Sequence, residues 1–230
     1  MYNEIPLTHD KTRYTLSLMP YRKFPPDKGN FYHIYNRSVG QQTIFTCYRD
    51  YERALETLNF YSFDKPGIRF SHFYRLNPKE KDNFLNKLER EHTRIMDIIA
   101  FCFMPTHIHF AFKEIRDDGI TTFMRKFQDS YAKYFNTKYK RVGALFQSMF
   151  KAERVLDDKS LVYVVNYIHF NPLKAGIVKT LKDLENYQGC SWTDYIGRRK
   201  LNFLNKSHIL KQFKNRNDFA TSSYSPNYNI

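Results

Sequence analysis

Alternating and helically spaced apolar residues divide the first half of the chain into a strand, a helix and a hairpin. Residues 31–36 form an aromatic and β-branched run after a turn signal, which predicts a strand. Residues 48–61 place apolar side chains three and four positions apart, which predicts a helix. Residues 97–103 predict a buried strand, and Pro105 in a tight turn directs residues 107–113 back beside it.

A second, longer helix is predicted over residues 120–138. Its aromatic side chains recur at helical spacing and form one stripe, made by Phe123, Phe127, Tyr131 and Tyr134. Packing in the core is the expected role of this stripe, and stacking against nucleic-acid bases is the alternative. An extended segment, residues 144–155, follows the helix.

The last strongly periodic segment is residues 159–170. Asp157 or Asp158 can cap the start of this helix. We expect it to end at Asn171–Pro172, because the residue before a proline avoids the α conformation. A further accessory helix is predicted over residues 207–214.

Changes in composition along the chain suggest how it divides into an extension, a main domain and a C-terminal segment. Residues 1–29 are predicted to be an N-terminal extension, residues 30–195 the main domain, and residues 196–230 an accessory helix with a flexible tail. Within the main domain, Pro- and Gly-containing turns and a charged helical stretch mark residues 63–91 as an insertion.

Composition narrows the class of partner. The 230-residue chain has a net charge of +14 and an isoelectric point near 9.6, which favours a polyanion and above all nucleic acid. A membrane is not expected, because no apolar run approaches the ~20 residues of a spanning helix. The three cysteines form no CxxC pair and the N-terminus carries no secretory pattern. We therefore expect a reducing, cytoplasmic location.

Two histidines one residue apart are the first candidate for chemistry. His107 and His109 flank Ile108 at the start of a predicted strand. Successive strand side chains point to opposite faces, so both imidazoles share one face. Such a pair can form half of a metal site, or it can consist of ordinary histidines in a half-buried strand.

The helix of residues 159–170 supplies the second candidate. Tyr163 and Tyr167 are four residues apart on one face, and Asn171 follows four residues later. Tyr167 and Asn171 can therefore project together toward a site. The alternative is that these tyrosines pack on an amphipathic helix with solvated hydroxyl groups.

In combination, these motifs resemble those of the IS200-like, single-tyrosine transposases of the HUH nuclease superfamily, and more narrowly the REP-associated tyrosine transposases. The resemblance covers residues 30–192 outside the insertion. Four segments carry it: Tyr35–Arg37, Met104–His109, Gly143–Gln147 and Tyr167–Pro172.

The resemblance implies an α+β, ferredoxin-like (RRM-like) fold of the HUH endonuclease type. Helices would pack on one face of an antiparallel sheet that carries His107 and His109. The last catalytic helix would lie against the sheet and bring Tyr167 close to the metal.

The resemblance also implies roles for individual residues. His107 and His109 correspond to metal ligands, Tyr167 to the nucleophile, and Asn171 to an amide ligand one turn later. Related transposases often carry Gln at that last position, so the shorter Asn171 departs from the family pattern. Two imidazoles and an amide oxygen suit Mg²⁺ or Mn²⁺.

The implied reaction is nicking and strand transfer of single-stranded DNA, near a DNA hairpin, through a covalent 5′-phosphotyrosyl intermediate. No nucleotide cofactor is expected, because the chain has neither a GxxxxGK[ST] loop nor a GxGxxG fingerprint. We expect a prokaryotic, nucleoid-associated protein that acts as a monomer or homodimer.

Phosphate contacts should come from cations near these motifs, since they dominate affinity for DNA. The candidates are Arg37, Lys138, Lys140, Arg141 and Lys151. A solvated basic surface is the alternative interpretation of each.

Two other functions remain open at this stage. One is a different HUH enzyme, such as a replication initiator or relaxase. The other is a non-catalytic nucleic-acid-binding regulator derived from the family.

Overall fold

A computed structural model describes residues 25–91 and 93–223. Most of the predicted N-terminal extension and the last seven residues of the predicted tail lie outside these ranges. The main elements alternate in the order β1 (Phe31–Arg37), α1 (Tyr48–Tyr61), β2 (Met96–Met104), β3 (His107–Glu114), α4 (Gly119–Lys138), β4 (Lys151–Val155) and α5 (Asp158–Lys174). A short 3₁₀ turn, Val39–Gln41, follows β1.

The four strands form one antiparallel sheet in the order β2-β3-β1-β4. β2 and β3 form the predicted hairpin, whereas β1 lies between β3 and the edge strand β4. This βαββαβ arrangement is the ferredoxin-like motif. The expected α+β, ferredoxin-like fold is confirmed.

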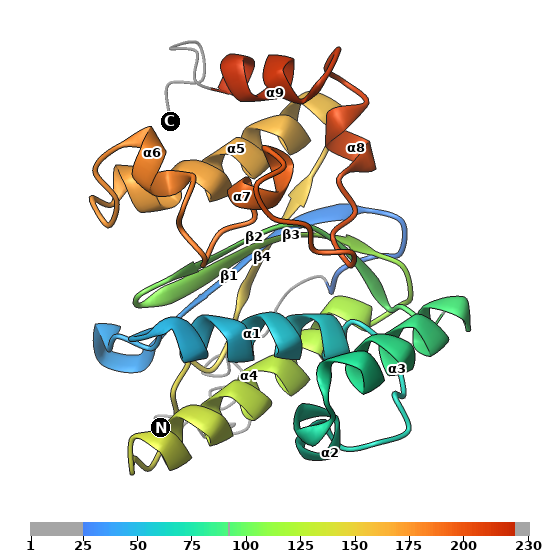
Figure 1. The fold of residues 1–230 in the computed structure, drawn as a ribbon, viewed down its shortest axis with the longest axis vertical. Helices are drawn as coiled ribbons and strands as arrows, with labels where there is room; N and C mark the ends of the chain where they lie inside the picture. The colour runs from blue at the N-terminus through green and yellow to red at the C-terminus, as the bar shows by residue number, and fades with distance from the viewer. Residues whose placement is uncertain (1–24, 92, 224–230) are drawn as a thin grey trace, which may run out of the picture.

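Helices cover both faces of the sheet (Figure 1). α1 and α4 lie on one face, and α5 crosses the other. We expected the helices to pack on one face of the sheet. This holds for α1 and α4, but α5 covers the second face. The reason is visible in β2, where eight of nine residues are buried, so both faces of this strand require a cover.

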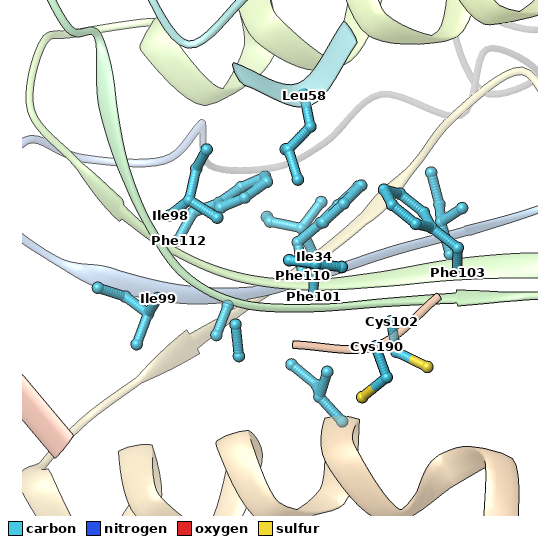
Figure 2. Close-up of a cluster of buried hydrophobic side chains, with 14 of the residues drawn as sticks. Ile34, Leu58, Ile98, Ile99, Phe101, Cys102, Phe103, Phe110, Phe112 and Cys190 are labelled. Atoms are coloured by element: carbon cyan, nitrogen blue, oxygen red, sulfur yellow. The ribbon is translucent and has the colours of Figure 1, made fainter. Parts of the chain in front are cut away.

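The core is therefore split between two layers (Figure 2). Phe103 and Phe110 project toward Leu58 of α1, while Cys102 and Cys190 lie together on the opposite side of the sheet. All five side chains are fully buried. The three cysteines are free thiols, and only Cys47 is exposed.

The aromatic stripe of α4 belongs to the core. Phe123, Phe127 and Tyr131 are fully buried, and the Tyr131 hydroxyl donates to the Ile44 carbonyl oxygen at 2.6 Å. Core packing is thus the correct interpretation for these three residues. No helix in the described parts of the chain, including the twenty-residue α4, is long and apolar enough to cross a membrane.

The predicted insertion folds into two helices, α2 (Phe70–Arg75) and α3 (Pro78–Arg90). The sequence pattern indicated α3 but not the short α2. Phe60 of α1 packs with Phe70 and Phe73 in a hydrophobic cluster of their own, separate from the main core. The insertion is therefore attached to the domain through α1.

The C-terminal part of the chain, after α5, packs onto the domain. It contains α6 (Leu181–Leu184), α7 (Trp192–Tyr195), α8 (Ser207–Leu210) and α9 (Arg216–Ser223). The predicted helix 207–214 is shortened to α8. Phe219 of α9 is fully buried and stacks near the Trp192 and Tyr195 rings, with centroids 5.7 and 5.1 Å away.

Helix α5 continues through Asn171 and Pro172 to Lys174, contrary to the predicted end. Pro172 lies in the final turn and has no amide hydrogen to donate to the Ile168 carbonyl oxygen, so the helix reaches Lys174 with one i→i−4 hydrogen bond missing. The Pro172 carbonyl oxygen accepts from the Ile177 and Val178 amides beyond the helix, which anchors the exit. Asn171 consequently has helical geometry, one turn after Tyr167.

A buried carboxylate joins the start of α1 to the end of α4. Asp50 accepts hydrogen bonds from the Thr46 amide and hydroxyl, the Tyr134 hydroxyl and the Lys138 ammonium at 2.6–2.9 Å. Burial alone would raise the pKa of Asp50, but the hydrogen bonds from Lys138 and Thr46 outweigh it and hold the pKa well below its ordinary value. Asp50 thus contributes to stability as an anion.

We expect Asp50→Asn to lower the free energy of unfolding by about 2–4 kcal/mol at neutral pH, because Lys138 would lose a buried ionic partner. The native pKa of Asp50 is depressed, so its contribution is complete above the unfolded value of about 3.9 and is lost progressively as pH falls from there toward the native pKa. Urea unfolding at pH 7 and at about pH 2.5 measures this. The gap between wild type and variant should narrow in acid, and the exposed control Asp117→Asn should show no such gap.

Candidate active site

One pocket contains the predicted histidines, tyrosine and asparagine. His107, His109, Tyr167 and Asn171 all line it, together with Arg37. The walls come from β1, β3, β4 and α5, on the sheet face opposite α1 and α4. The structure therefore brings together residues that are as many as 134 positions apart, from Arg37 to Asn171.

Strand alternation and register explain this convergence. On β3, Ile108 is fully buried on the core face, while His107 and His109 share the face that α5 covers. β1 pairs with β3 so that Tyr35 is opposite His109 and Arg37 is opposite His107. Each histidine consequently has a β1 side chain of the pocket beside it.

Both predicted ligand histidines are held in a state that can bind a metal. Burial lowers the pKa of His107, and the positive charge of Arg37 lowers it further. Burial likewise holds the pKa of His109 well below its usual value, assisted by its neighbours His33, His107 and Arg37. A neutral imidazole offers the lone pair that a metal requires.

Each of these rings uses its Nδ1 atom within the protein. Nδ1 of His107 lies 3.0 Å from the Thr106 hydroxyl, and Nδ1 of His109 lies 3.0 Å from Nε2 of His33. The Nε2 atom of each ring takes no part in these two contacts and is the nitrogen that could bind a metal. This is the arrangement of metal-binding histidines, whose second nitrogen is hydrogen-bonded to the protein.

His33, Tyr35 and Glu153 are pocket residues that the sequence reasoning missed. Tyr35 donates to Oε1 of Glu153 at 2.7 Å, and Oε2 of Glu153 is 3.6 Å from Nδ1 of His33. The hydrogen bond to Glu153 raises the pKa of Tyr35 to about 12. The alternation of His33 and Tyr35 in β1 was a usable signal, but their proximity to His109 depends on strand order.

Tyr167 faces the histidines across the pocket. Its ring centroid is 5.7 Å from that of His33 and 5.8 Å from that of His109, with both pairs edge-on. Lys174, less than two turns further along α5, places its ammonium 5.9 Å from the Tyr167 ring centroid. Tyr163 also lines the pocket and is 45% exposed, so part of this side chain is accessible to a ligand.

The tyrosines of the α4 stripe lie outside this pocket and cannot replace Tyr167 as nucleophile there. Tyr131 is fully buried with its hydroxyl bonded to the protein, and Tyr134 donates to Asp50 beneath the opposite sheet face. Neither lines the pocket, whereas Tyr163 and Tyr167 of α5 both do.

Asn171 is 8% exposed, and its buried Nδ2 atom has no hydrogen-bond partner. Rotation of the amide by 180° would exchange nitrogen and oxygen and direct the oxygen to this unpartnered position. Two imidazole nitrogens and one amide oxygen fit Mg²⁺ or Mn²⁺. In the described ranges, no group of three or more His, Cys, Asp or Glu side chains is arranged to hold a metal ion.

The predicted DNA-contacting cations are dispersed. Arg37 is in the pocket. Lys151 begins the edge strand β4, opposite Tyr35, and is exposed. Lys138 is paired with Asp50, and Arg141 donates to Asn136 and the Ala144 carbonyl oxygen. Exposed Lys140 follows α4 with a left-handed φ of 50°. Contacts of these residues with DNA remain predictions.

Comparison with known proteins agrees with this architecture. Residues 76–171 match the family model described as transposase IS200 like. This range includes both histidines, Tyr167 and Asn171. Over this range, the chain is similar to the IS200-like transposases.

Two further relatives are more specific. A Haemophilus influenzae protein described as a REP-associated tyrosine transposase is 28% identical over 97 residues, 38% of this chain. The match spans 55% of that relative, about half its length. A solved REP-associated tyrosine transposase bound to a REP hairpin is similar in fold, with a TM-score of 0.50 and 16% identity over 82% of this chain and 94% of the other.

The electrostatic state of this pocket can be measured directly. In the metal-free protein, NMR titration of the imidazole nitrogens should give pKa values below about 6.5 for His107 and His109. Arg37→Ala should raise the pKa of His107, because it removes a positive charge that disfavours protonation. Titration of His107 at or above the value of a free histidine, or no response to Arg37→Ala, would contradict the described environment.

Proposed function

We propose that this protein is a metal-dependent HUH endonuclease that nicks single-stranded DNA and transfers the strand through a covalent phosphotyrosine. The observation that carries the proposal is the convergence of Tyr167 with His107, His109 and Asn171 in one pocket. Similarity to IS200-like transposases supports the reaction class.

Tyr167 is the proposed nucleophile. Its phenol would release its proton to solvent, and the phenolic oxygen would form a bond to phosphorus of the scissile phosphodiester while the bond to the 3′ oxygen breaks. The 5′ end of the DNA then remains on Tyr167, and the departing strand ends in a 3′-hydroxyl once its oxygen takes up a proton. Attack on the phosphotyrosine by another 3′-hydroxyl would reverse these bonds, so the DNA is rejoined without ATP.

His107, His109 and Asn171 are the proposed metal ligands. A Mg²⁺ or Mn²⁺ ion held there would act as a Lewis acid toward the scissile phosphate. His107 and His109 would present two neutral imidazoles from a rigid strand, and Asn171 would present an amide from the same helix face as Tyr167. Such placement reduces the reorganisation needed when phosphate binds.

Single-stranded DNA beside a hairpin is the proposed substrate. The solved neighbour with the same fold was bound to a REP hairpin. In this chain, Arg37 supplies a cation inside the pocket and Tyr163 a half-exposed ring. Unpaired bases can stack on such a ring, while cations contact the phosphates.

The nucleophile is tested by comparing Tyr167→Phe with Tyr163→Phe, a matched loss of one hydroxyl in the same pocket. Each variant is incubated with a 3′-labelled hairpin oligonucleotide and Mn²⁺, and the covalent adduct is separated on a denaturing gel. We expect Tyr167→Phe to abolish the adduct and Tyr163→Phe to retain it.

Equal adduct formation by wild type and Tyr167→Phe would overturn the assignment of Tyr167. DNA binding by the wild type without any adduct in Mn²⁺ or Mg²⁺ would instead favour the regulatory function. A preference for an origin-like substrate over a hairpin would favour the initiator or relaxase.

The contribution of Arg37 to DNA binding can be isolated by its salt dependence. Arg37→Ala should weaken single-stranded DNA binding and reduce the slope of log affinity against log salt by about 1, because one phosphate contact is lost. Fluorescence anisotropy at several salt concentrations measures this. The control Lys87→Ala, on the exposed side of α3, should leave the slope unchanged; an unchanged slope for Arg37→Ala would remove Arg37 from the interface.

A further inference from the structure

We propose that Glu153 and His33 are positioning residues that fix the tautomer and orientation of His109 for metal binding. This inference rests on the proposed function, because it assumes that His109 is a ligand. It gives a role to two pocket residues from β1 and β4, whereas the proposed metal ligands come from β3 and α5.

The first step is geometric. The His33 and His109 rings are stacked, with centroids 5.2 Å apart and an interplanar angle of 15°. Nε2 of His33 is 3.0 Å from Nδ1 of His109, a hydrogen-bonding distance. His33 is 7% exposed and His109 6%, so solvent competes little for this contact.

The second step concerns the direction of that hydrogen bond. Two neutral imidazoles can share one proton in either direction, and the choice decides which nitrogen of His109 has a free lone pair. A carboxylate beside the outer nitrogen resolves this choice. Oε2 of Glu153 lies 3.6 Å from Nδ1 of His33, where its negative charge favours a proton on that nitrogen.

The third step follows from proton counting. With its proton on Nδ1, neutral His33 has a lone pair on Nε2 and can only accept there. His109 must then carry its proton on Nδ1 and donate it to His33. Nε2 of His109 is left with the lone pair that a metal requires.

The carboxylate is itself held in place. Tyr35, on the same strand face as His33, donates to the other oxygen of Glu153 at 2.7 Å. The register of the sheet puts His33 opposite Glu153 on β4. The Glu153 side chain is 63% exposed, so Tyr35 restricts a group that would otherwise sample many rotamers.

The alternative for His33 is direct ligation of the metal. The direct hydrogen-bonding distance to His109 argues against this, because a metal between the two rings would replace that bond. The proposal therefore specifies two imidazole ligands, His107 and His109, with His33 outside the coordination sphere.

The test measures metal binding and tautomer rather than DNA cleavage. Isothermal titration of the full-length protein with Mn²⁺ should show affinity about 10–100-fold weaker in His33→Ala, the usual effect of losing such a partner. His33→Gln should restore most of the affinity, because its amide oxygen can accept from Nδ1 of His109. Glu153→Ala should cause a smaller loss than His33→Ala.

Nitrogen NMR of the metal-free protein measures the tautomer of His109, which would not change if His33 had only a structural role. The wild type should show His109 protonated on Nδ1, and His33→Ala should produce a mixture of both tautomers. Electron spin-echo spectroscopy of bound Mn²⁺ should detect two coordinated imidazoles in the wild type. The matched controls are His72→Ala, at an exposed site on α2, and Glu91→Ala, at an exposed site just after α3.

The outcomes separate this inference from the function on which it rests. Wild-type Mn²⁺ binding that His33→Ala leaves unchanged, in a variant with native circular dichroism, would overturn the positioning role alone. Three coordinated imidazoles would also overturn it and make His33 a ligand. Absence of Mn²⁺ binding by the wild type, or an adduct that forms without any divalent metal, would overturn both.

Discussion

The antiparallel pairing of β1 with β3 places Tyr35 opposite His109 and Arg37 opposite His107. A slip of one residue in this register would turn Tyr35 and Arg37 to the core face and bring Ile34 to the pocket. The register is protected because Ile34 and Phe110 are fully buried on the other face. The hydrophobic layer beneath α1 and α4 thus fixes the geometry of the polar layer beneath α5.

The polar layer is completed by a helix whose position depends on remote contacts. α5 packs on β2 and β3, and His169 within it is buried beside Ser191, with Nε2 2.9 Å from the serine hydroxyl oxygen. Ser191 also donates to the Phe101 carbonyl oxygen in β2. The C-terminal segment therefore holds α5 against the sheet and keeps Tyr167 facing His109.

Local sequence patterns predicted the elements that local forces determine. The bounds of α1 agree with the helical spacing of residues 48–61, and the β2–β3 hairpin agrees with the apolar run and Pro105. The predicted end of α5, at Asn171–Pro172, was wrong because contacts beyond the local sequence keep Pro172 within the last turn of the helix. His33 and Glu153 could not be placed near His109, because their proximity requires the non-local order of β3, β1 and β4.

The prediction of the site residues was limited in the same way, by contacts that are not local in sequence. His107 with His109, and Tyr167 with Asn171, are short-range pairs whose shared faces follow from strand and helix periodicity. Their meeting in one pocket is not a short-range property, and it required either the fold or the resemblance. Lys138 shows the converse, since a basic sequence context concealed its ion pair with a carboxylate 88 positions away.

β4 pairs with β1 on one side and forms an outer edge of the sheet. Its five residues include Lys151, Glu153 and Arg154, and such charged edges resist pairing with strands of other molecules. Short edge strands are also among the first parts of a sheet to open locally. Because Glu153 is proposed to fix the tautomer of His33 and through it that of His109, each fraying event at this edge removes the charge that selects the metal-binding tautomer, so metal occupancy and the local opening of β4 are thermodynamically linked.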